Sequence, residues 1–199
     1  MEKTFNPKPL LRNPHLQSML ASLGIRSLGK NDMVKFARQM IIDGGGGVRL
    51  LGFHSTQPNN GSRGFILLLH GWEGSVNSTY MLHTGRYLFD MGYDIFRLNL
   101  RDHGESHHLN QGLFHGALTE EVVKAAENIS TLSRRKPFYI IGFSLGGNFA
   151  LRIALNPFDK LNHVICVSPL LDPYKTTLTI DGGPFPYRYY FLRKWKRSL

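Results

Sequence analysis

A serine between two glycines is the feature of this 199-residue sequence that most directly suggests chemistry. Ser144 lies in the stretch GFSLGGN, with Gly142 two residues before it and Gly146 two residues after it. In a sharp G-x-S-x-G turn from strand to helix, the glycines let the two elements approach, and the serine is held exposed in a strained backbone conformation. Such a serine is suited to act as the nucleophile of an acyl transfer. Two other interpretations are a glycine turn with an incidental serine and a phosphate-binding loop, although no Gly-Lys-Ser/Thr follows.

Two backbone N–H groups could stabilise the negative oxygen that forms when a serine attacks a carbonyl group. The first belongs to Leu145, at the start of the helix expected after the serine, where N–H groups are free and the helix dipole is positive. The second belongs to Trp72 in the stretch LLLHGWEGS, because the loop after an earlier strand commonly supplies this donor. The alternative is that His70 and Trp72 pack in the core beneath a turn.

The elements that must position these groups alternate along the chain. Short apolar runs predict buried strands at 65–70, 94–100, 137–143 and 163–169, and apolar residues at helical spacing predict helices at 77–91, 118–132 and 145–155. This alternation predicts an α/β fold, with a mostly parallel sheet and helices on both faces. Before it, extended runs between residues 33 and 53 predict a hairpin around Asp43 and four glycines. Asn13 before Pro14 is typical of a helix start.

Composition is that of a folded chain, with 42% hydrophobic and 19% charged residues, and the length is enough for one domain. No apolar run approaches the ~18 residues of a membrane-spanning helix, and we expect no signal peptide. Cys166 is the only cysteine, so no internal disulfide can form, which fits a cytoplasmic location. Its apolar surroundings predict a buried core thiol.

Positive charge gathers at the end of the sequence. The net charge is +10, and residues 184–199 contain five basic residues and no acidic one. Aromatic and basic residues interleave between Tyr187 and Arg197, which suggests contact with a membrane surface. The alternative is a cap helix whose aromatic face packs over a substrate cleft. No zinc-finger spacing or RNA-binding signature is present, so we expect no nucleic-acid partner.

Five motifs together identify a family. They are NPHLQS (13–18), HGWEGS (70–75), RLNLRDHGES (97–106), NQGLFHG (110–116) and GFSLGGN (142–148). With them the chain resembles the α/β-hydrolase superfamily and, within it, the YheT-like hydrolases. The resemblance implies a serine hydrolase of the carboxylesterase or lipase-like kind that acts on a small-molecule ester, lipid-like esters included, without metal or organic cofactor. It implies Ser144 as the nucleophile, Leu145 and Trp72 as oxyanion donors, and the start of a cap segment at 170–199.

The histidine and acid of a catalytic triad are harder to place. The resemblance implies the chain order Ser, then Asp or Glu, then His. The one histidine after Ser144 is His163, which we expect at the end of a strand opposite the serine. Asp172 before Pro173 is interpreted as a helix cap rather than the acid. Four histidines that precede the serine match no standard zinc spacing and are interpreted as part of a loop over the active-site end of the sheet: His103, His107, His108 and His115.

We therefore expect the triad histidine and acid downstream of these residues. We count about six strands, so the chain is interpreted as one incomplete domain: an N-terminal segment at 1–32, the core sheet and helices at 33–169, and the start of a cap at 170–199. The 199 residues alone should then have little activity. The alternatives are a truncated, non-catalytic protein of the same fold and a membrane-surface binding module.

Overall fold

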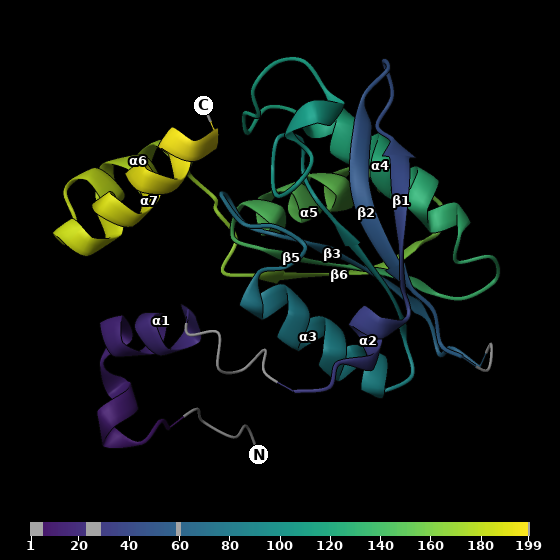
Figure 1. Cartoon of the computed structure of the whole chain (residues 1–199), viewed down its shortest axis with the longest axis horizontal. Helices are drawn as coiled ribbons and strands as arrows, with labels where there is room; N and C mark the ends of the chain where they lie inside the picture. Colours follow the sequence, from purple (N-terminus) through teal and green to yellow (C-terminus); the bar gives the residue numbers. More distant parts are fainter. Residues whose placement is uncertain (1–5, 23–28, 59–60, 199) are drawn as a thin grey trace.

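The computed structural model describes residues 6–22, 29–58 and 61–198, which form a six-stranded sheet with helices on both faces (Figure 1). The strand order is β1-β2-β4-β3-β5-β6. β4, β3, β5 and β6 run parallel, whereas β1 and β2 pair antiparallel with their neighbours. The strands are β1 (Ala37–Asp43), β2 (Arg49–Ser55), β3 (Phe65–Leu69), β4 (Asp94–Leu98), β5 (Phe138–Phe143) and β6 (Leu161–Val167). The predicted α/β class with a mostly parallel sheet is confirmed.

The helices cover the sheet in two layers. α4 (Thr119–Thr131) and α5 (Leu145–Leu155) lie on one face, and α2 (Asp32–Lys35) and α3 (Thr79–Asp90) lie on the other (Figure 1). α1 (Pro14–Ser22), α6 (Pro173–Asp181) and α7 (Phe185–Ser198) lie to one side of the sheet. Two short 3-10 helices, η1 (Pro9–Arg12) and η3 (His107–Leu109), complete the described elements. None of the described helices is both long and apolar enough to span a membrane.

The central strand β3 shows why its sequence is a continuous apolar run. Phe65, Leu67 and Leu69 pack into the core beneath α4 and α5, while Ile66 and Leu68 pack beneath α2 and α3. All five side chains are buried, because a strand with a helix layer on each face leaves neither side exposed to water. β5 pairs with β3 in parallel, so the loops that follow these two strands lie together at the carboxyl end of the sheet.

Two helix starts confirm their predictions. The Asn13 side chain accepts the N–H groups of His15 and Leu16, so it caps α1. Asp172 accepts the N–H of Lys175 at 2.9 Å and begins α6, as expected for a cap residue before a proline.

Three expectations about local structure were wrong. The run from residue 33 does not start as a strand, because the Asn31 side chain accepts the N–H of Val34 and Met33 is buried within the short helix α2. β6 is not buried, and Ile165 and Val167 are 49% and 42% exposed, because β6 pairs with β5 alone within the described chain. For the same reason Cys166 is only partly buried, although that burial still raises the pKa of its thiol.

Candidate active site

Ser144 stands at a sharp turn between β5 and α5, as the sequence predicts. Its backbone has φ 51° and ψ −112°, a left-handed conformation that is costly for a residue with a side chain. The Ser144 N–H donates to the carbonyl of Val167 at 3.0 Å, and its carbonyl accepts the N–H of Leu170 at 3.1 Å. These bonds hold the strained turn in place, and the serine side chain remains exposed to solvent.

The flanking glycines are required by the close approach of backbones. A Cβ on Gly142 would lie 2.2 Å from the carbonyl oxygen of Gly146, and a Cβ on Gly146 would lie 2.4 Å from that of Leu69. Real Cβ atoms are not found at such distances, and the obstructing atoms are main-chain atoms that cannot rotate away. The structure therefore leaves no space for a side chain at either position, which agrees with the glycines of the G-x-S-x-G pattern.

Strained residues gather at the carboxyl end of the parallel strands. Of the five described non-glycine residues with positive φ, four follow successive parallel strands: Glu73 after β3, Asp102 after β4, Ser144 after β5 and Ser168 after β6. Backbone strain persists where surrounding structure maintains it, and ligand sites in α/β sheets lie at this edge. The strained residues therefore lie at the same end of the sheet as Ser144.

The HGW loop, residues 70–78, lies directly beside the serine. A Cβ on Gly71 would stand 3.2 Å from the Cβ of Ser144. Of the eight backbone N–H groups from 71 to 78, seven are accepted by other groups of the described chain, and that of Trp72 is not. On the opposite side, the Leu145 N–H precedes the first hydrogen bond of α5, which runs from Asn148 to Ser144. Both predicted oxyanion donors are therefore without an acceptor among the described residues, on the two segments that meet at Ser144.

A model of the alpha/beta hydrolase fold family matches residues 64–198. The chain belongs to the α/β-hydrolase family.

Two curated relatives and a solved structure match part of the chain. The chain is 30% identical over 122 residues to an uncharacterized protein of Rickettsia prowazekii, covering 58% of this chain and 48% of the relative. It is 28% identical over 117 residues to a Synechocystis protein named "Putative esterase", covering 56% of this chain and 31% of the relative. The chain thus spans half or less of the length of these curated relatives. An esterase structure from Pyrococcus furiosus superposes with a TM-score of 0.64 at 20% identity, covering 86% of this chain and 67% of that one.

Two buried histidines anchor the HGW loop of this α/β-hydrolase chain. The Nδ1 of His70 lies 2.7 Å from the carbonyl oxygen of Gly71, and its Nε2 accepts the N–H of Leu100. Because a carbonyl can only accept, Nδ1 carries the proton and the ring is neutral. His103 repeats the arrangement, donating from Nδ1 to the Arg101 carbonyl and accepting the Glu73 N–H at Nε2. The two rings lie 5.0 Å apart, and both nitrogens of each are occupied by backbone groups.

Burial explains why these rings stay neutral. It lowers the pKa of His70 to about 3, with a further lowering from neighbouring His103, and it also lowers the pKa of His103. Neither ring can serve as the base for Ser144 while it holds these backbone groups. His70 is therefore a buried core residue, which was one of the two interpretations of the sequence. The loop that it holds nevertheless lies beside Ser144.

We expect the free energy of unfolding to fall as the pH decreases from about 6.5 toward 3. Over this range the unfolded chain binds a proton at His70 that the folded chain excludes, so acid favours unfolding. Urea midpoints at pH 7 and pH 5 would measure the change. His70→Gln should reduce the difference between the two midpoints, whereas His163→Gln, at an exposed ring, should preserve it. An unchanged difference in His70→Gln would contradict the assignment.

Three residues that sequence reasoning missed also hold the HGW loop. The Tyr80 hydroxyl accepts the N–H of Gly71 at 3.0 Å. The Asn99 side chain accepts the N–H of Val76, and buried Arg97 donates to the carbonyl of Val76, both at 2.8 Å. Arg97 and Asn99 lie in the quoted motif RLNLRDHGES, but no local pattern shows that they reach across to the neighbouring loop.

The other histidines do not complete a triad within the described residues. His163 lies in the first half of β6, away from the carboxyl end, as predicted. His107 pairs with Asp102 at 2.5 Å within the loop after β4, and His108 and His115 are exposed in that same loop. The described chain contains no group of three or more His, Cys, Asp or Glu side chains arranged to hold a metal ion.

Helix α7 lies over the HGW loop from the other side. The Lys194 Nζ donates to the Glu73 carbonyl at 2.7 Å, and the Phe191 ring stacks on Trp72 with centroids 5.4 Å apart. The Tyr187 hydroxyl contacts His15 Nδ1 of α1 at 2.9 Å. One face of α7 thus packs over the HGW loop, which lies beside the serine.

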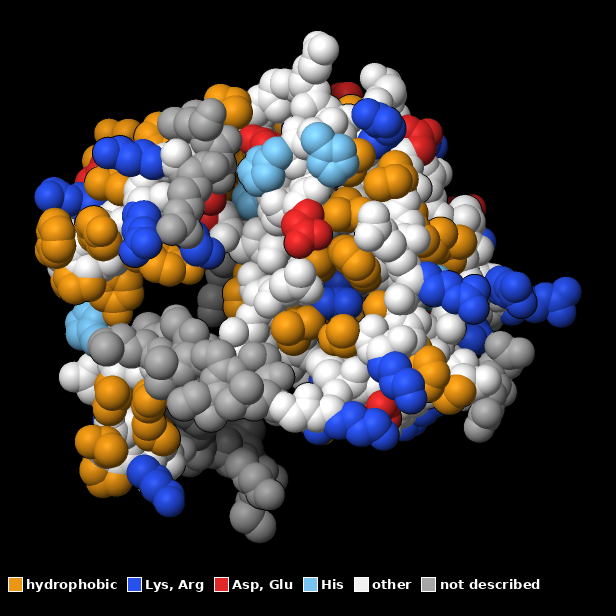
Figure 2. All heavy atoms as spheres, in the orientation of Figure 1, with side chains coloured by type: hydrophobic (Ala, Val, Ile, Leu, Met, Phe, Trp, Pro, Cys, Tyr) orange, Lys and Arg blue, Asp and Glu red, His pale blue; other side chains and the backbone are white. Residues whose placement is uncertain are grey.

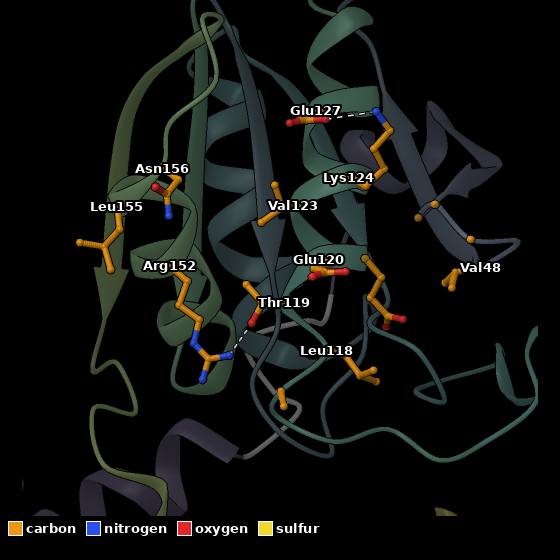
Figure 3. Close-up of a pocket in the computed structure, with 15 residues that line it drawn as sticks. Val48, Leu118, Thr119, Glu120, Val123, Lys124, Glu127, Arg152, Leu155 and Asn156 are labelled. Carbon is orange, nitrogen blue, oxygen red and sulfur yellow. Dashed lines mark hydrogen bonds and ion pairs between the residues drawn. The ribbon is translucent and has the colours of Figure 1, made fainter.

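A groove of about 930 Å³ lies elsewhere, between the glycine turn of the β1–β2 hairpin and helices α4 and α5 (Figure 3). None of the candidate site residues lines it. Several of its charged side chains interact within the protein: Lys124 pairs with Glu127, and Arg152 donates to Thr119. Because the groove is lined by none of the candidate site residues, it is not the candidate active site, whatever its volume.

Proposed function

We propose that this chain carries the nucleophile and oxyanion hole of a serine esterase. The observation that carries the proposal is the exposed, strained Ser144 between two backbone N–H groups, those of Trp72 and Leu145, that have no acceptor among the described residues. This is the arrangement that an acyl-transfer enzyme needs, since the charge on the intermediate develops beside the nucleophile.

In the proposed reaction, the Ser144 oxygen attacks the carbonyl carbon of an ester while a histidine takes the hydroxyl proton. The N–H groups of Trp72 and Leu145 then donate to the negatively charged oxygen. The intermediate expels the alcohol, which receives the proton, and leaves an acyl group on Ser144. Water, activated by the same histidine, releases the acid and restores the serine. No metal or organic cofactor takes part in this scheme.

We propose that the histidine and acid come from outside these 199 residues. Supporting this, His70 and His103 are occupied by backbone groups, and Asp172 caps α6. The curated relatives are at least twice as long as the matched region, which leaves room for both groups. The motif set favours the YheT-like branch of the family, and the lone Cys166 favours the cytoplasm. An ester substrate is supported by the name of the Synechocystis relative.

Labelling with a fluorophosphonate, which reacts with activated serines, tests the proposal. The protein expressed to its natural stop codon should be labelled at Ser144, and Ser144→Ala should remove the label. The 199-residue chain should be labelled far more slowly, because without a base the hydroxyl stays protonated. No labelling of the longer protein would favour the alternative of a non-catalytic protein with this fold.

The oxyanion assignment predicts different effects from two neighbouring substitutions. Trp72→Phe keeps the backbone N–H and an aromatic ring against Phe191, so most of the esterase rate should remain. Gly71→Val places a branched side chain where even a Cβ would be 3.2 Å from Ser144 and 3.3 Å from the Phe143 carbonyl oxygen. We expect it to lower kcat on the order of 10²-fold, as loss of one donor does. Equal small effects in steady-state assays would mean that the HGW loop is not the oxyanion hole.

A further inference from the structure

Helix α7 presents two faces of different character. The inner face carries Phe191 and Lys194, which contact the HGW loop, and Tyr187, which contacts α1. These contacts fix the rotation of the helix about its axis. Because successive residues turn by 100°, the face opposite these contacts carries Phe185, Tyr189, Leu192, Arg193 and Lys196, and it is flanked by the exposed side chains of Arg188 and Trp195.

The outer face of α7, defined by those seven residues, is exposed and combines two kinds of side chain. Its apolar members stand far into solvent, with Phe185 66% and Trp195 48% exposed. Its three basic members are also exposed, and α7 contains no acidic residue. Figure 2 shows orange and blue side chains intermingled over the region that α6 and α7 occupy in Figure 1. The side chain of Arg197 lies outside the described part.

The segment before α7 also exposes apolar side chains. Leu171, just before α6, and Tyr174 and Leu178 within α6 are exposed, and α6 contacts α7. The acidic residues of this segment are Asp172, which caps α6 and lies 3.6 Å from Lys175, and Asp181. The surface thus combines apolar side chains, whose transfer out of water is favourable, with an excess of cationic over anionic side chains.

We propose that the outer face of α7 docks the protein on an anionic lipid bilayer. Aromatic and aliphatic side chains on a basic helix insert at the boundary of headgroups and acyl chains, while arginine and lysine extend to the phosphates. Charge complementarity favours a bilayer with net negative charge over a neutral one. A single-stranded nucleic acid fits less well, because its binding sites are grooves that track the backbone, whereas this surface is the outside of a helix.

Docking by this face would place the serine edge next to the lipid. The inner face of the same helix holds the HGW loop through Lys194 and Phe191, so α7 lies between bilayer and site. The substrate class that follows is an ester of a lipid or another amphiphile, and this part of the inference rests on the proposed function. The docking itself does not.

Vesicle flotation tests the docking with the protein expressed to its natural stop codon. One set of vesicles is pure phosphatidylcholine, and the other contains about one-third phosphatidylglycerol to supply the anionic surface. Binding to the anionic set should fall steeply between 0.01 and 0.15 M salt, because the Debye length falls from ~30 Å to ~8 Å. Equal binding to both sets, salt-insensitive binding or no binding would overturn the proposal.

Matched variants locate the surface. The triple variant Arg188→Glu, Arg193→Glu, Lys196→Glu should lose at least about tenfold in binding to the anionic vesicles. The control is Arg38→Glu, Arg135→Glu, Lys160→Glu, which makes the same change in net charge at exposed positions outside α7 and should keep most of the binding. Equal losses in the two triples would mean that overall charge, and not this helix, causes the binding.

Tryptophan fluorescence reports insertion directly. The chain has two tryptophans, so Trp72→Phe leaves Trp195, at the border of the outer face, as the single reporter. Its emission should shift to shorter wavelength with anionic vesicles, and an unshifted spectrum would contradict insertion. Ser144→Ala should bind vesicles like the wild type. Binding without esterase activity would therefore leave the docking standing and remove the proposed function, whereas activity on soluble esters without binding would do the reverse.

Discussion

Ser144→Ala should lower ester hydrolysis by the protein expressed to its natural stop codon by about 10⁴–10⁶-fold, the loss seen when serine hydrolases lose a triad member. The physical reason is that the substitution removes the atom that forms the bond to the acyl group. The Trp72 and Leu145 N–H groups would remain, so a small rate above that of water should persist. Steady-state assays should show the loss in kcat, with KM changed far less.

A second serine at the same edge provides the control for this prediction. Ser168 also has positive φ, 46°, is exposed and follows the neighbouring strand β6. Ser168→Ala makes the same chemical change at another residue with positive φ, on a segment that carries neither predicted oxyanion donor, and should leave the rate within a few-fold. Comparable losses in the two variants would show that this edge of the sheet, rather than the Ser144 hydroxyl, determines activity.

Local sequence patterns correctly predicted those helices and strands whose first and last residues are determined by residues adjacent in the sequence. α5 spans residues 145–155, as expected, because it begins directly after Ser144 in the sharp G-x-S-x-G turn, here called the elbow, and its apolar residues repeat at helical spacing. β3 and β5 lie within one residue of their predicted bounds, since continuous apolar runs bounded by polar or glycine-containing segments leave little freedom. Ser144 could be singled out for the same reason, because the elbow requires glycines at fixed offsets.

The remaining parts depend on contacts between segments far apart in the sequence. The Arg97 and Asn99 side chains reach the loop that precedes α3, more than twenty residues earlier, and no periodicity encodes that reach. The sequence alone left the role of His70 open, because its motif fits both a buried residue that holds the loop and a residue of the active site. It was settled by the hydrogen bonds to Gly71 and Leu100. The exposure of β6 depends on strand order, which hydrophobic runs do not specify.

The elbow glycine Gly146 gives the second large expected effect. Gly146→Ala should destabilise the fold by about 3 kcal/mol or more, at or above the upper end of the usual cost of overpacking a core. The added Cβ would lie 2.4 Å from the Leu69 carbonyl oxygen and 2.5 Å from that of His70, both of them main-chain atoms at the end of central β3. Relief requires α5 to move away from the sheet, which also separates the Leu145 N–H from the Trp72 N–H. Stability and esterase rate should therefore fall together.

Thermal unfolding measures this effect against a glycine that has room. Gly116→Ala would bring its Cβ no closer than 3.9 Å to Leu145 Cδ1, an ordinary van der Waals contact. We expect Gly146→Ala to lower Tm by about 6–12 °C, since 1 kcal/mol corresponds to roughly 2–4 °C in a domain of this size, and Gly116→Ala to change it little. If the two variants unfold at the same temperature, the close approach of α5 and β3 does not constrain this fold. The requirement for glycine at position 146 would then have to come from the reaction itself, because only a loss of rate without a loss of stability would remain.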